Sequence, residues 1–146
     1  MAVETITKPS LTIKRHIKAP PAQVFAAWTD PQKVMRWMGP SGFTGRHAEC
    51  DTRPGGRYHW AMKSPDGEDH DVSGVYREVV ADEKLVFTWA WKSTPERQSL
   101  VTVLLKPDGA GTLLTLIHEQ FFDDAVRDGH QKGWSGSLDK LEKLFA

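Results

Sequence analysis

Hydrophobic and polar positions alternate along several stretches of the chain, with the two-residue period of half-buried β-strands. The first stretch is "LTIKRHIKA", where Leu11, Ile13 and Ile17 alternate with polar neighbours. Six further stretches of this kind follow, separated mainly by short turn sequences rich in glycine, proline and aspartate. They predict strands over residues 46–52, 57–63, 70–80, 84–92, 98–106 and 112–121. Consecutive strands with short connections favour an antiparallel meander.

Helix signals lie on either side of this run of strands. Pro20 and Pro21 predict the start of a short helix, because the first turn of a helix does not need their missing N–H groups. Asp30 and Pro31 have the residue types of a cap and first position for a second short helix, which ends at Gly39. The third helix is expected to close the chain. The only element long enough to cover one face of the sheet is this last helix.

The closing helix is predicted over residues 127–145 and contains three glycines, each of which costs about 1 kcal/mol relative to alanine in a helix interior. On a helical wheel the small residues gather on one side: Ala125, Gly129, Gly133 and Gly136. Such a stripe allows another backbone, or a ligand, to approach closely. The alternative is that the glycines mark a frayed or kinked start and that the firm helix begins near Ser135.

Five stretches in this order carry a resemblance to a known superfamily: "IKAPPAQVFAAWTDPQKVMRW", "DTRPGGRYHWAM", "GVYREVVADEKLVFTW", "GTLLTLIHEQF" and "GHQKGWSGSLDKLEKLF". The chain resembles the START-like (SRPBCC) helix-grip superfamily, which shares the birch-pollen-allergen fold. Within it, the chain is similar to the bacterial branch related to the C-terminal domain of the activator of heat-shock protein 90 ATPase. The resemblance implies one α+β domain over residues 1–146, with about seven antiparallel strands curved around the C-terminal helix and two short helices after the first strand.

Composition narrows the possible partners and location. The 19 basic and 19 acidic residues give a net charge of zero, which argues against a nucleic-acid or anionic-membrane partner. No apolar run approaches the roughly 20 residues of a membrane span, and the first residues lack a signal-peptide pattern. Cys50 is the only cysteine, so no internal disulfide can form and a cytoplasmic location is expected.

One face of the predicted sheet is unusually aromatic. Its alternating residues are Tyr58, Trp60, Met62, Phe87, Trp89 and Trp91. Trp134 of the last helix, together with Trp37, is expected to meet this face. The resemblance implies a cavity here, between sheet and helix, that binds an apolar or amphipathic small molecule. The same alternation would also arise from a plain, well-packed core.

Polar residues on this face would orient a ligand. On the last strand both faces are fairly apolar, and the family pattern places Leu114, Leu116 and His118 inward. In a regular strand Tyr76 and Glu78 would share a face, and His130 lies on the apolar side of the last helix. The polar ligand-contact candidates are therefore Tyr58, Tyr76, Glu78, His118 and His130.

Two other functions stay open. Relatives with this fold include polyketide cyclases and aromatases, for which Glu78, His118 and Tyr76 would be the acid–base candidates. A chaperone-activating role follows from the family name, but the eukaryotic co-chaperone has a separate N-terminal domain for which 146 residues leave no room.

No cofactor is expected, and the spacing of His47, Cys50 and His59 does not predict a metal site. An exposed edge of the meander could pair in a homodimer.

Overall fold

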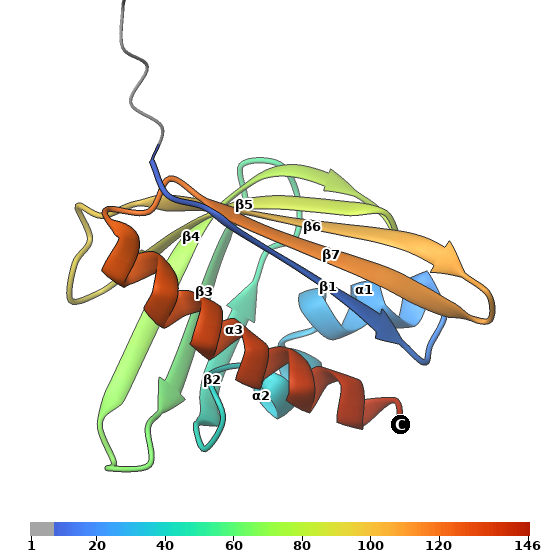
Figure 1. The fold of residues 1–146 in the computed structure, drawn as a ribbon, viewed down its shortest axis with the longest axis horizontal. Helices are drawn as coiled ribbons and strands as arrows, with labels where there is room; N and C mark the ends of the chain where they lie inside the picture. The colour runs from blue at the N-terminus through green and yellow to red at the C-terminus, as the bar shows by residue number, and fades with distance from the viewer. Residues whose placement is uncertain (1–7) are drawn as a thin grey trace, which may run out of the picture.

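The computed structural model describes residues 8–146, which form one curled antiparallel sheet and three helices (Figure 1). The strands follow the order β1-β7-β6-β5-β4-β3-β2, so the first strand pairs with the last. Their bounds are β1 Leu11–Ile17, β2 Thr44–Cys50, β3 Arg57–Lys63, β4 Asp69–Val80, β5 Lys84–Trp91, β6 Ser99–Asp108 and β7 Gly111–Glu119. The helices are α1 Pro21–Thr29, α2 Pro31–Trp37 and α3 Asp124–Leu144. The predicted helix-grip fold is confirmed.

The last helix, α3, crosses one face of the sheet, and α1 and α2 lie near its C-terminal end (Figure 1). Asp123 caps α3 by accepting a hydrogen bond from the backbone N–H of Val126 at 2.9 Å. The helix therefore starts three residues before the predicted Arg127, and it continues unbroken through the three glycines. The alternative of a frayed start is wrong. No helix within residues 8–146 is long and apolar enough to cross a membrane.

The glycine stripe of α3 faces the loop between α2 and β2. A Cβ atom at Gly136 would lie only 2.6 Å from the backbone nitrogen of Ser41, and one at Gly133 would lie 3.3 Å from Cγ of Pro40. A Cβ atom at Gly129 would meet nothing within 4 Å. One end of the stripe is therefore in contact with a backbone, and the other borders open space.

Lys140 holds the same loop against α3. Its Nζ donates hydrogen bonds to the carbonyl oxygens of Met38, Pro40 and Phe43, at 3.0, 3.2 and 3.2 Å. Three carbonyls of one short loop thus converge on a single cation. Lys140 draws the loop toward α3, and the backbone at Gly136 prevents a closer approach. These two contacts together set the distance between the loop and the helix.

Alanine at two positions of the stripe should have opposite effects on stability. Gly129→Ala should raise the free energy of unfolding by up to about 1 kcal/mol, since alanine favours the helix and nothing obstructs its methyl group. Gly136→Ala should lower it by about 1–2 kcal/mol, because the methyl group would overlap the backbone of Ser41. Urea unfolding of both variants measures the difference. Equal effects would contradict the close approach at Gly136.

Candidate functional site

A cavity of about 340 Å³ lies between the sheet and the N-terminal half of α3. From the sheet, Trp60 and Met62 of β3 and Trp89 and Trp91 of β5 form one wall. Because side chains on one face of a strand are two residues apart, each strand contributes a pair. The resulting wall is large, rigid and apolar.

The opposite wall comes from α3 and carries little side-chain volume. Ala125, Gly129 and Gly133 face the cavity, flanked by His130 and Trp134. These small residues are spaced four apart, which places them above one another on one side of a helix. The stripe identified in the sequence therefore borders both a backbone, at Gly136, and an empty volume.

The loop between α2 and β2 closes one end of the cavity. Gly39 and Pro40 line it there. Gly39 has a φ of +85°, a backbone conformation that side chains disfavour, and a Cβ atom on it would lie 2.8 Å from Cβ of Phe43. These two residues, like Val126 and Ser137 of α3, were not among the residues predicted to bind a ligand. For the loop, proline and glycine indicated only a turn.

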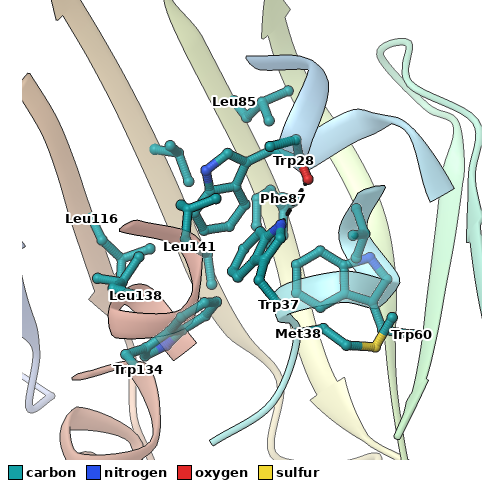
Figure 2. Close-up of a cluster of buried hydrophobic side chains, with 14 of the residues drawn as sticks. Trp28, Trp37, Met38, Trp60, Leu85, Phe87, Leu116, Trp134, Leu138 and Leu141 are labelled. Carbon is teal, nitrogen blue, oxygen red and sulfur yellow. Dashed lines mark hydrogen bonds between the residues drawn. The ribbon is translucent and has the colours of Figure 1, made fainter. Parts of the chain in front are cut away.

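Of the fourteen predicted ligand-contact residues, six line the cavity and seven are packed in the core beside it. The six are Trp60, Met62, Trp89, Trp91, His130 and Trp134. The seven are Trp37, Tyr58, Tyr76, Phe87, Leu114, Leu116 and His118. Figure 2 shows Trp37 and Phe87 next to Trp28, with Trp134, Leu138 and Leu141 of α3 on the other side of this cluster. The inward placement of Leu114, Leu116 and His118 is confirmed.

The predicted inward position of Glu78 is wrong. The register between β4 and β5 shifts between Tyr76 and Glu78, so the strand contains a bulge and its alternation changes there. Glu78 is exposed and pairs with Lys84, whose Nζ lies 3.2 Å from its Oε2. Val79, one residue later, packs against the core instead.

His118 is wholly buried and has a partner at each ring nitrogen. Nδ1 accepts a hydrogen bond from the indole N–H of Trp134 at 2.9 Å, and Nε2 lies 2.7 Å from the hydroxyl of Ser99. An indole can only donate, so the proton of the neutral ring is on Nε2 and is donated to Ser99. The Ser99 hydroxyl in turn donates to the carbonyl of Trp89. Burial, with the nearby His130, lowers the pKa of His118 well below its usual value.

His130 forms a similar pair at the edge of the cavity. Its Nε2 accepts the indole N–H of Trp91 at 2.9 Å, and its Nδ1 donates to the carbonyl of Val126 at 2.8 Å. Burial lowers the pKa of His130. Both histidines are therefore neutral acceptors for tryptophan, and their rings are 5.2 Å apart.

The proposed acid–base candidates do not meet in one site. Tyr76 is buried in the core, where burial raises the pKa of its hydroxyl. His118 has both nitrogens occupied, and Glu78 lies outside the cavity. Burial likewise raises the pKa of Tyr58, whose hydroxyl donates to the carbonyl of Thr88. The arrangement can enclose an apolar molecule, and the residues that line the cavity include no carboxylate.

Residues 18–146 match the family described as "Activator of Hsp90 ATPase homolog 1-like protein". Among solved structures, a protein of Chromobacterium violaceum is 28% identical with a TM-score of 0.84, covering 93% of this chain and 96% of that chain. An AHSA1 protein of Silicibacter pomeroyi is 29% identical with a TM-score of 0.83 over the same shares. A protein of Rhizobium leguminosarum is 30% identical with a TM-score of 0.77, covering 94% and 93%. Among curated proteins, none matches.

Stability should decrease in acid, and His118 should be one cause. The unfolded chain binds a proton at His118 below about pH 6.5, whereas the folded chain keeps the ring neutral, so acid favours unfolding. Each such histidine contributes a slope of about 1.4 kcal/mol per pH unit below that pH. In His118→Gln the amide can accept from Trp134 and donate to Ser99 at any pH, so this share of the slope should disappear. Denaturant unfolding across the acid range measures it.

The matched control is His47→Gln, at an exposed position on β2 where the ring lies 3.2 Å from a carboxylate oxygen of Glu49. This variant should retain the share of the slope that His118→Gln removes. An unchanged slope in His118→Gln would contradict the assignment of a neutral, buried ring.

Proposed function

The chain belongs to the family of activator of Hsp90 ATPase homolog 1-like proteins, and from this premise we propose that it binds an apolar or amphipathic small molecule. The proposed site is the cavity between β3, β5 and α3. Its volume of about 340 Å³ falls in the range of small-molecule sites, which is roughly 300–1,000 Å³. This cavity is the observation on which the proposal rests.

Glycine in α3 lowers the stability of the helix but leaves the cavity unfilled, which supports a function for the cavity. Ala125 and Gly129 are exposed where they line the cavity, so this part of the cavity is open to solvent. Leucine at Gly129 would favour the helix and its Cβ atom would meet nothing within 4 Å, so helix stability alone would favour the larger residue. Glycine there sacrifices stability and keeps the volume open. That combination is expected of a binding site.

The apolar lining indicates the class of ligand. Trp60, Trp89 and Trp134 border the cavity with the edges of largely buried rings, and burying apolar area contributes about 25 cal/mol per Å². The polar atoms of His130 are already bonded to Trp91 and Val126. The indole N–H groups of Trp60 and Trp89 have no hydrogen-bond partner within residues 8–146, but the rest of the lining is largely apolar. Affinity in this cavity would therefore come mainly from burial of apolar surface.

The catalytic alternative receives less support. The cyclase-type reaction was expected to use Glu78, His118 and Tyr76 in the same cavity, and none of them lines it.

The cytoplasmic location and the homodimer remain predictions. For a homodimer, the sheet edges are β1 and β2.

Filling the cavity should abolish binding of a neutral apolar probe without unfolding the protein. In Gly129→Leu the side chain would extend into open space in the cavity. We expect decanol to bind the wild-type protein and to bind Gly129→Leu at least tenfold more weakly, which corresponds to about 1.4 kcal/mol. Isothermal titration calorimetry measures both affinities.

The matched control is Gln131→Leu, which adds the same side chain to the exposed side of the same helix. Its affinity for decanol should equal that of the wild-type protein. If decanol does not bind the wild-type protein, or if both leucine variants bind it equally well, the cavity is not the site.

A further inference from the structure

A smaller chamber of about 100 Å³ adjoins the main cavity. The two share Trp89, Trp91, Val126 and His130 as lining residues. The smaller chamber lies at the turn between β5 and β6 and the segment between β7 and α3, where Arg97 and Phe122 complete its lining. A ligand in the main cavity thus has a second compartment next to it.

The two chambers differ in charge and polarity. Among all residues that line either one, Arg97 alone carries a permanent charge, and none is an aspartate or glutamate. The smaller chamber also has the hydroxyl-bearing residues Thr94 and Ser99, whereas Ser137 is the hydroxyl-bearing residue of the larger one. One end of the combined volume is therefore apolar, and the other is positive.

The position of Arg97 suits recognition of an anion. Its guanidinium carbon lies 3.9 Å from the centroid of the Phe122 ring, so the ring covers the guanidinium group and the N–H edges remain for a partner. The backbone N–H of Arg97 donates to the carbonyl of Thr94 at 3.0 Å, which fixes the turn. Glu96 is next to Arg97 in the chain, and Asp123 is next to Phe122. Even so, Arg97 forms no ion pair within residues 8–146.

At the boundary between the chambers, the side chains of Trp91 and His130 have no free hydrogen-bonding group for a ligand. Trp91 donates its indole N–H to His130, and His130 donates its other nitrogen's proton to Val126. The indole N–H of Trp89, which lines both chambers, has no hydrogen-bond partner within residues 8–146, but it is an uncharged donor. Among the lining residues, an anionic head group therefore finds a permanent positive charge at Arg97. Burial of such a group without a partner would be unfavourable.

We propose that the natural ligand is an amphipathic carboxylate, with its apolar body in the main cavity and its carboxylate at Arg97. This assignment rests on the proposed function and specifies the ligand class. A guanidinium group pairs with both oxygens of a carboxylate through its planar fork of N–H donors. Arg97 would thus orient the ligand, and the wall of tryptophans would supply most of the affinity.

The test compares three probes of equal chain length: decanoate, decanol and decylamine. At neutral pH and low salt we expect decanoate to bind the wild-type protein most tightly and decylamine least tightly. In Arg97→Gln, decanoate should bind about fivefold more weakly, a modest change because the arginine is exposed, while decanol affinity stays constant. Added salt should weaken decanoate binding to the wild-type protein and leave decanol binding unchanged.

The matched control is Arg77→Gln, which removes the same charge from an exposed position on β4 that lines neither chamber. It should retain the wild-type preference for decanoate. Equal binding of decanoate and decanol by the wild-type protein, or an equal loss in both arginine variants, would overturn the role of Arg97 and leave the cavity as a binding site. Failure of all three probes to bind would overturn the proposed function as well.

Discussion

The chain of hydrogen bonds from Trp134 through His118 and Ser99 to the carbonyl of Trp89 connects α3 with β7, β6 and β5. Each member has its donors and acceptors assigned, because the indole only donates and the carbonyl only accepts. A buried network of this kind is favourable only when every member is satisfied. It fixes the N-terminal half of the helix above the sheet, and the cavity exists because the helix stays at that height.

The C-terminal half of α3 is held by contacts of a different kind. Gly136 lies against the backbone at Ser41, and Lys140 binds three carbonyl oxygens of the same loop. Leu138 and Leu141 are fully buried next to Trp28 and Trp37 (Figure 2). Tight packing at this end and small residues at the other explain how one helix can both complete the core and leave a volume empty.

Much of the fold follows from the periodicity of the sequence, because turns and alternating strands are local features. The position of a residue along a curved sheet is not local. Trp60 lines the cavity and Tyr58 does not, although both belong to one face of β3. The bulge that turns Glu78 outward depends on the pairing with β5, and the contact between Arg97 and Phe122 joins two segments that are separated in the sequence. In contrast, the glycine stripe of α3 was visible in the sequence, since its four-residue spacing is a property of the helix itself.

The polar groups near the cavity explain why specificity would have to originate at its rim. The histidines use their nitrogens to satisfy tryptophan N–H groups and neighbouring oxygens, so they stabilise the walls and have little left for a ligand. The indole N–H groups of Trp60 and Trp89 have no partner within residues 8–146, but they carry no charge. Aromatic walls of this kind distinguish molecules mainly by size and shape, and a methylene group more or less changes affinity only modestly. An apolar chamber of this kind accepts a class of molecules. Discrimination by charge requires a charged group outside the cavity, and the turn between β5 and β6 carries one, Arg97.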